Sequence, residues 1–285
     1  FAILPFIDDG DEVMIPSPSY PNNYLDVETM GGKVVPIVLS AKDDYQLDVD
    51  QMREKLNSKT KMVLLTHPNN PTTTVYNRES LEKLRDFVVD NDLILVVDQA
   101  FEDFTYDNEM ITPASMDGMF ERTVTVFSFS KGMGLSGLRI GYIVTDDYIM
   151  DTMFANAVGV IGATSTSSQK AIIEAMKHPE FMKIFEDAYE YTRHKAFEIL
   201  NSIPNVSCEL PQSGFLCWVD VSKLGNSSDI VSYLVKEAKV SVNDGINYGE
   251  GGKGHLRIVL GVYKDNNRVV DALVRIKEAL TKYQG

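Results

Sequence analysis

Residues 128–142 of the chain read Ser128-Phe129-Ser130-Lys131-Gly132-Met133-Gly134-Leu135-Ser136-Gly137-Leu138-Arg139-Ile140-Gly141-Tyr142. The apolar residues 124–127 before this stretch predict a strand, and the glycines after Lys131 predict a bend that a small ligand can approach closely. Lys131 offers an amine nucleophile, and Arg139 offers a permanent planar cation eight residues later. The pair points to a ligand that carries a carbonyl group and a phosphate.

Ordinary structural roles are the alternative for both residues. A lysine beside a glycine is common in a solvated turn, and an arginine at the start of a strand often makes a surface ion pair. The choice between these interpretations depends on the rest of the chain.

Composition excludes several classes of protein. The 285 residues are 44% hydrophobic and 24% charged, which fits one large or two moderate globular domains. The formal net charge is −14 and the basic residues are scattered, so we expect no nucleic-acid partner. No apolar run has the length of a membrane span, and residues 1–4 lack the pattern of a secretory signal, so we expect a cytoplasmic protein without a membrane partner. Cys208 and Cys217 are expected to be structural and reduced.

Short β-branched runs alternate with amphipathic segments in the first two thirds of the chain. The runs at 12–15, 33–38, 61–66, 93–98, 123–127 and 138–144 predict strands, and residues 47–56 and 78–91 predict helices. This alternation predicts an α/β fold whose mostly parallel sheet lies between helices.

The last third of the chain has a different pattern. Residues 178–202 predict a long connecting helix, followed by strands at 214–221 and 256–261 and helices at 228–238 and 267–280. We therefore expect a large domain at 1–178 and a connector helix with a small α+β domain at 179–285. The chain has no initiator methionine and opens in what resembles the last turns of a helix, so we expect residues before Phe1 in the natural protein and a large domain incomplete at its N-terminus.

Three predicted strands end in polar side chains. Asn70 follows the strand at 61–66, Asp98 ends the strand at 93–98, and Lys131 follows the strand at 123–127. In open α/β sheets, ligands bind outside the carboxyl ends of the strands, so an amide, a carboxylate and an amine are expected at one crevice. Singly, Asn70 before a proline could be a turn residue, and Asp98 could cap a helix or loop. The coincidence of all three positions favours a ligand site.

These residues make the chain resemble the class I/II pyridoxal-phosphate-dependent aminotransferases of the aspartate-aminotransferase fold. The serine, lysine, glycine and arginine spacing of residues 128–141 is the most specific match. The other matches are residues 10–13, 18–21, 68–72, Asp98 and residues 255–258. The resemblance implies a seven-stranded type of sheet in the large domain, and a homodimer with shared active sites.

The resemblance also implies a role for each site residue. Lys131 would carry pyridoxal 5′-phosphate covalently and transfer the substrate proton, and Asp98 would pair with the pyridine nitrogen. Arg257 would bind the substrate α-carboxylate, and Asn70 would be the second substrate-binding residue. The remaining cofactor contacts would come from Ser128 and Arg139 at the phosphate, Asn70 at the phenolate oxygen, and Tyr20 stacked on the ring, although an ordinary packing role is equally open for Tyr20.

The chain departs from the family pattern at several positions. Phe101 stands where the family usually has a tyrosine that donates to the phenolate oxygen, and Thr73 replaces a glycine of the asparagine loop. Residues 151–169 contain no arginine, which disfavours aspartate specificity through a second arginine in that segment. In the family, the region that would precede Phe1 supplies part of the phosphate site and a tyrosine that reaches across the dimer.

The leading functional prediction is an aminotransferase that moves an amino group between an amino acid and a 2-oxo acid. A lyase or decarboxylase of the same fold uses the same cofactor and is not separated by sequence. A non-catalytic or truncated member of the family is the third alternative.

Overall fold

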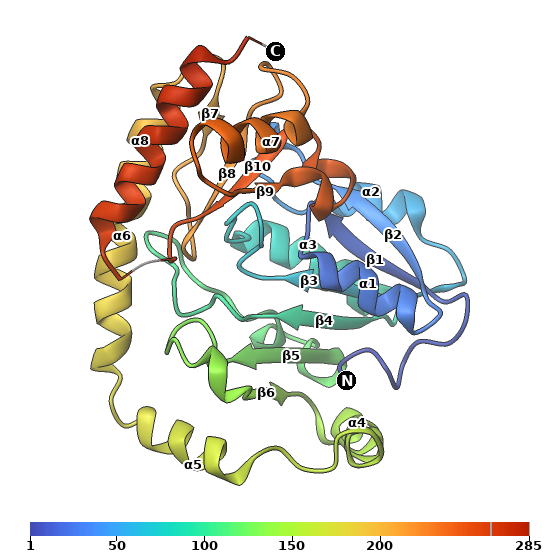
Figure 1. Cartoon of the computed structure of the whole chain (residues 1–285). Helices are drawn as coiled ribbons and strands as arrows, with labels where there is room; N and C mark the ends of the chain where they lie inside the picture. Colours follow the sequence, from blue (N-terminus) through green and yellow to red (C-terminus); the bar gives the residue numbers. More distant parts are fainter. Residues whose placement is uncertain (263, 285) are drawn as a thin grey trace.

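A mostly parallel sheet forms the centre of the larger part of the protein (Figure 1). The structure is a computed structural model that describes residues 1–262 and 264–284. The strand order is β2-β1-β3-β4-β5-β6. The strands are β1 (Glu12–Ser17), β2 (Lys33–Val38), β3 (Thr60–Thr66), β4 (Ile94–Asp98), β5 (Thr123–Ser128) and β6 (Gly141–Val144). The first five are parallel, and β6 pairs antiparallel with β5. The α/β prediction is confirmed, with six strands among the described residues where a seven-stranded type was expected.

Helices cover both faces of this sheet. They are α1 (Pro21–Thr29), α2 (Val49–Lys55), α3 (Arg78–Asp90) and α4 (Asp147–Val160), whereas α5 (Thr166–Ala175) follows α4 beyond the β6 edge (Figure 1). Val63 and Leu65 of β3 share one core with α2 and α3, whereas Met62 and Leu64 share the opposite core with α1 and α4. Alternate residues of β3 are thus buried on opposite faces, and this explains its continuous apolar sequence.

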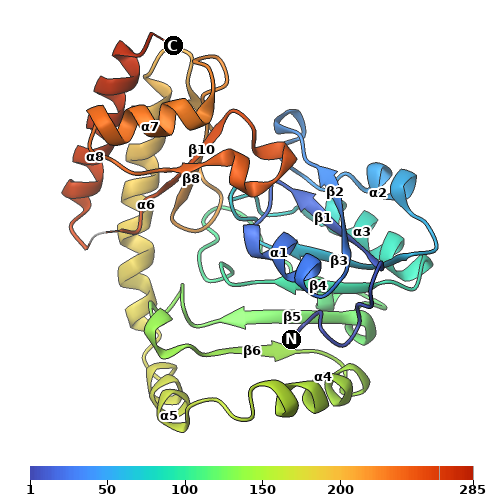
Figure 2. The same cartoon turned by 45° about the vertical axis from the view of Figure 1, so that its right-hand side comes forward.

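A smaller antiparallel sheet follows helix α6 (Glu180–Asn201) in the chain and lies on its inner side, while α6 runs along one side of the molecule (Figures 1 and 2). Its order is β7-β8-β10-β9. Its strands and helices are β7 (Ser207–Cys208), β8 (Leu216–Asp220), β9 (Asn243–Asp244), β10 (His255–Val259), α7 (Ser227–Glu237) and α8 (Asn266–Lys282). Helices α6, α7 and α8 pack with β8 and β10 in one core, where Cys208 and Cys217 are buried and free. The domain boundary at residue 178 stays a prediction.

Short 3-10 helices complete the secondary structure. They are η1 (Ala41–Asp43), η2 (Pro113–Ser115), η3 (Phe120–Arg122), η4 (Ser136–Leu138), η5 (Gly245–Tyr248) and η6 (Glu250–Gly252). The strand expected at 138–144 begins only at Gly141, because η4 ends at Arg139 with φ +56°, a left-handed conformation that extended backbone does not adopt.

Two further expectations differ from the structure. Residues 3–6 form a turn, so the helix expected there is wrong: Ile3 and Ile7 are buried against the sheet, and their spacing of four imitates a helical stripe. Helices α1, α4 and α5 were not predicted. In α4 the apolar residues lie on all sides, since Ile149 and Met153 are buried while Phe154, Val158 and Val160 are exposed, so the sequence shows no apolar stripe distinct from a polar face.

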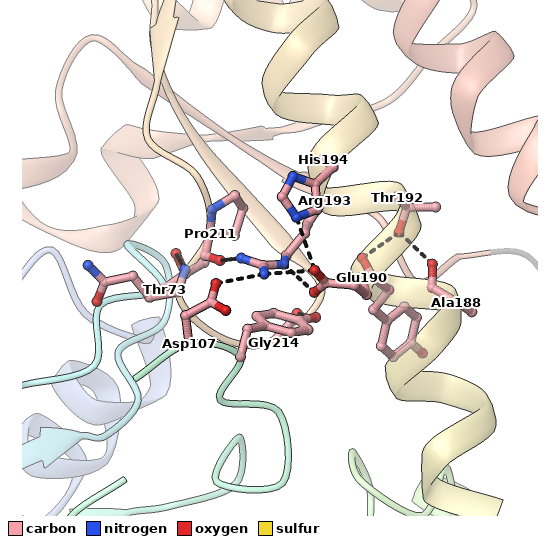
Figure 3. A network of polar contacts seen from close by, with 12 residues as sticks. Thr73, Asp107, Ala188, Glu190, Thr192, Arg193, His194, Pro211 and Gly214 are labelled. Atoms are coloured by element: carbon pink, nitrogen blue, oxygen red, sulfur yellow. Dashed lines mark hydrogen bonds and ion pairs between the residues drawn. The ribbon is translucent and has the colours of Figure 1, made fainter. Parts of the chain in front are cut away.

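A buried arginine joins α6 to the large domain (Figure 3). Arg193 is 2% exposed and donates to Glu190 Oε2 at 2.6 Å, Asp107 Oδ2 at 2.9 Å and the Pro211 carbonyl at 3.0 Å. Its guanidinium also lies 4.0 Å from the centre of the Tyr106 ring. One planar group therefore holds together α6, the loop after β4 and the segment before β8.

Replacement of Arg193 by lysine should lower the free energy of unfolding by on the order of 2 kcal/mol, because one ammonium group cannot reproduce the four directed hydrogen bonds and the ring contact. Urea denaturation measures the change. The matched control is Arg78→Lys, whose exposed ion pair with Glu109 predicts a change within about 0.5 kcal/mol. Equal losses in the two variants would contradict the role of the Arg193 network.

Candidate active site

The carboxyl ends of β3, β4 and β5 meet at one edge of the sheet, since these strands are parallel neighbours. Asn70 lies in the loop after β3, Asp98 is the last residue of β4, and Lys131 follows β5. The structure therefore places the predicted amide, carboxylate and amine at the same edge. Lys131 interacts electrostatically with Asp98 and with Arg257 of β10, so the small sheet also faces this edge.

The Lys131 amine lies against two aromatic rings. Its Nζ is 5.4 Å from the centre of the Phe101 ring and 5.7 Å from that of Phe215. Burial, together with the positive charge of Arg257, lowers the pKa of Lys131, and the Asp98 carboxylate opposes this shift. Gly214 makes room for the Phe101 ring: it has φ +65°, and a Cβ there would lie 2.9 Å from Phe101 Cδ1. The lysine is thus partly desolvated.

The Asp98 carboxylate is held by its own turn, where Oδ1 accepts a hydrogen bond from the Ala100 amide at 3.0 Å. Burial raises the pKa of Asp98, while the Ala100 amide and the positive charge of Lys131 favour the ionised form. A partly buried carboxylate beside an amine that it does not contact directly can accept a proton or pair with a bound cationic group.

Arg257 connects the small sheet to the asparagine loop. Its Nη1 donates to Asn70 Oδ1 at 3.1 Å, and its Nε and Nη2 donate to Asn243 Oδ1 at 3.2 and 2.8 Å. The guanidinium lies 5.0 Å from the centre of the Tyr248 ring. Burial lowers the pKa of Arg257, and the nearby phenol groups of Tyr248 and Tyr20 oppose the shift. Tyr20 is exposed at the start of α1, close enough to this group to influence it.

Ser128 and Arg139 lie at the loop end of the β5–β6 hairpin, where residues 129–140 connect the two strands. Ser128 pairs with Gly141, two residues after Arg139, and its Oγ accepts a hydrogen bond from the Ser130 amide at 3.2 Å. The Arg139 guanidinium is exposed and donates from Nη1 to the Ser136 carbonyl at 2.8 Å. The hairpin brings the backbones of the two residues to one end, and the Arg139 side chain is directed to its own 3-10 turn.

Sequence reasoning missed three residues of this site: Phe215, Asn243 and Tyr248. Asn243 pairs with Arg257 across β9 and β10, but β9 has only two residues and gives no periodic signal. Phe215 lay inside the predicted strand 214–221, where an aromatic residue is ordinary. Tyr248 lies in the short helix η5, and no sequence signal marked it.

The loop that carries Asn70 is anchored by a buried histidine. His67 is fully buried and stacks on Tyr76 with ring centres 5.2 Å apart. The Ile111 carbonyl accepts from Nε2 at 3.1 Å, and Nδ1 accepts from the Tyr76 amide at 3.4 Å, an arrangement that assigns the neutral ring. Burial lowers the pKa of His67 to about 4, which the Ile111 carbonyl opposes only in part.

Residues 1–262 and 264–284 contain neither a metal-binding cluster nor a membrane-spanning helix. These residues contain no group of three or more histidine, cysteine, aspartate or glutamate side chains arranged to hold a metal ion. None of their helices is long and apolar enough to cross a membrane.

Comparison with known proteins identifies the family. The model of the class I and II aminotransferases matches residues 1–273. The chain belongs to this family. The resemblance based on the motifs of residues 128–141 is thereby confirmed, and with it the expectation that the chain is an aminotransferase.

Relatives of this aminotransferase include a probable aspartate/prephenate aminotransferase of Aquifex aeolicus, 32% identical over 97% of this chain and 72% of its own length. Aromatic-amino-acid aminotransferase 2 of Thermococcus litoralis is 32% identical over 90% of this chain and 67% of its own length. The solved aromatic aminotransferase of Pyrococcus horikoshii superposes with a TM-score of 0.94 at 29% identity, over 99% of this chain and 76% of that structure. The chain thus spans about two thirds to three quarters of these relatives.

The His67 environment predicts how stability depends on pH. The folded pKa of about 4 lies below the ordinary 6.5, so the unfolded chain binds a proton that the folded protein excludes. Stability should therefore be complete above pH 6.5 and should fall by on the order of 3 kcal/mol as the pH drops to 4. Denaturation of the native chain and of His67→Gln across this range measures the effect.

The His67→Gln variant should be less stable at pH 7 but should lose less stability on acidification. His194→Gln, on the exposed side of α6, is the control and should retain most of the native slope. An unchanged slope in His67→Gln would show that other groups cause the pH dependence.

On the expectation that Lys131 binds pyridoxal phosphate, Phe101 predicts a raised pKa for the nitrogen that joins them. A phenyl ring cannot donate to the phenolate oxygen of pyridoxal phosphate, so the pKa of the cofactor-bound Lys131 nitrogen should be higher than in tyrosine-bearing relatives. Phe101→Tyr should lower this pKa, and Phe101→Leu, which also lacks a hydroxyl, should not. Absorbance titration against pH decides, and an equal or higher value in Phe101→Tyr would refute the prediction.

Proposed function

We propose that this aminotransferase carries pyridoxal 5′-phosphate on Lys131 and moves an amino group between an amino acid and a 2-oxo acid at the edge formed by β3, β4 and β5. The observation that carries the proposal is the environment of the Lys131 amine. It is partly desolvated, its pKa is lowered, and it lies within the electrostatic influence of both Asp98 and Arg257. A neutral amine is the form that attacks an aldehyde and accepts a proton.

The donor set at this edge fits the cofactor. Asp98 would pair with the pyridine nitrogen, and its carboxylate has the Oδ2 atom open for that purpose while Oδ1 accepts from Ala100. Asn70 contacts Arg257 through its amide oxygen, so its Nδ2 would donate to the phenolate oxygen. Ser128 and Arg139 would hold the phosphate, and Tyr20 would cover the ring. When bound, pyridoxal phosphate supplies an electron sink for the charge left by deprotonation of the substrate.

The protein residues would then divide the work at the substrate. Arg257 would bind the α-carboxylate, which is common to all amino acids and 2-oxo acids. A guanidinium has five N–H donors, of which three are used with Asn70 and Asn243, so each terminal nitrogen keeps one for a planar carboxylate. Lys131 would take the proton from the substrate Cα and return it at the cofactor C4′ position.

We also propose a homodimer with shared active sites and a cytoplasmic location. Apolar side chains exposed on α4 and α5 support a second protein surface at this side, among them Phe154 at 66% and Ile173 at 60% exposure. The free cysteines Cys208 and Cys217 agree with a reducing compartment. Sedimentation analysis would test the dimer, with a monomer at micromolar concentration as the contrary result.

Replacement of Lys131 by alanine should abolish the absorbance of the bound cofactor. It should also lower the rate of transamination at least about 10³-fold, a magnitude typical of losing a covalent and proton-transfer group. Arg193→Lys, away from the edge, is the control and should retain the absorbance. Retained transamination in Lys131→Ala would contradict the assignment.

Product analysis separates transamination from the alternative chemistry. With an amino acid and a 2-oxo acid together, transamination yields a new amino acid without release of ammonia. A lyase of the same fold would release ammonia from the amino acid alone, and a decarboxylase would release carbon dioxide. A screen of donors and acceptors by this assay would also identify the substrate class.

A further inference from the structure

A set of aromatic side chains connects the large domain to Arg257. The first contact is a hydrogen bond of 3.2 Å between the Tyr45 hydroxyl and His255 Nε2. Tyr45 belongs to the loop after β2, whereas His255 opens β10 in the small sheet. Because the Lys253 carbonyl can only accept the bond of 2.9 Å from His255 Nδ1, the neutral ring carries its proton there, and the Tyr45 hydroxyl donates to Nε2.

Strand β10 links His255 to Arg257, which lies two residues later. Side chains of a strand alternate between its faces, so His255 and Arg257 share one face, while Leu256 and Ile258 are buried in the core of the small domain. The hydrogen bond thus fixes β10 against the large domain two residues from the guanidinium.

Trp218 completes the connection on β8, directly opposite Arg257 in the antiparallel register. Its ring stacks on His255 with centres 4.9 Å apart and an angle of 5°, and it meets the Tyr248 ring edge-on at 5.9 Å. Tyr248 in turn lies beneath the Arg257 guanidinium at 5.0 Å. Contacts therefore run without a break from Tyr45 to Arg257.

The Tyr45 end of this set is itself well fixed. Tyr45 is 8% exposed and packs in the large-domain core, and its backbone has φ +54°, an uncommon conformation for a residue with a side chain. A loop held in this way gives the hydroxyl a defined position. The hydroxyl that bonds His255 is therefore held in place by the large-domain core.

We propose that Tyr45, His255 and Trp218 are positioning residues that hold Arg257 in the orientation that binds the substrate α-carboxylate. This inference rests on the role proposed above for Arg257. Neither Tyr45 nor His255 touches the reacting atoms; both act through β10, and Trp218 transmits the constraint from the neighbouring strand. Loss of the Tyr45–His255 bond should weaken carboxylate binding in both substrates and leave the turnover number nearly unchanged.

The test is a double-mutant cycle on the cofactor-loaded protein. Tyr45→Phe and His255→Phe each remove the hydrogen bond but keep an aromatic ring, and the double variant removes both partners. The probes are 3-phenylpropionate and succinate, carboxylates that lack the amino group and cannot react. Their dissociation constants are measured by calorimetry and by the fluorescence of Trp218, the one tryptophan of the chain.

Each single variant should raise the dissociation constant about fivefold, as expected for loss of one hydrogen bond, and the double variant should raise it no further because the pair acts as one unit. The KM for amino acid and 2-oxo acid should rise by a similar factor with kcat nearly constant. The matched control is Tyr233→Phe, which removes a hydroxyl that donates to the Ala279 carbonyl at 3.4 Å away from the site, and it should leave binding unchanged.

The inference is overturned if Tyr45→Phe and His255→Phe lower thermal stability but leave the dissociation constants unchanged, or if their effects multiply in the double variant. Arg257→Lys distinguishes this result from failure of the proposed function. If Arg257→Lys weakens carboxylate binding and Tyr45→Phe does not, only the positioning role falls. If Arg257→Lys has no effect, the carboxylate role of Arg257 falls and the positioning role falls with it.

Discussion

The shared direction of β3, β4 and β5 is the constraint on which the site depends. Parallel strands present their carboxyl ends at the same edge, so polar residues that follow neighbouring strands are brought together although they lie far apart in the sequence. Asn70, Asp98 and Lys131 meet there for that reason. The strand bodies are buried on both faces, which leaves the ends as the place where charged groups remain accessible.

The edge becomes a site only because the small sheet closes on it. Arg257 reaches across to Asn70, and its positive charge contributes to the lowered pKa of Lys131. The same guanidinium would bind the substrate and bias the amine toward its neutral form, so binding and proton transfer share one electrostatic cause. Arg193 on α6 and the Tyr45–His255 contact join the two parts of the chain at separate places through directed hydrogen bonds. Trp218 and Tyr248 add apolar contact, because both are buried in the core of the larger part.

The surroundings of Lys131 are more aromatic than the family pattern implies. Phe101 removes a hydroxyl from the site, and Gly214 provides the space in which its ring lies beside Phe215. Burial and the charge of Arg257 lower the pKa of Lys131, whereas the Asp98 carboxylate raises it.

The sequence by itself determined the α/β class, the positions of the buried strands and the family, because β-branched runs, helical periodicity and the spacing of residues 128–141 are local signals. It also identified the polar residues at three strand ends. It did not determine where β6 begins, since the left-handed conformation of Arg139 follows a turn that has no strong sequence signature. Only the tertiary structure decided the partners of Arg257, the rings around Lys131 and the contact of Tyr45 with His255. These pairs are separated by up to 210 residues along the chain, and such contacts depend on how two sheets pack, which no local pattern encodes.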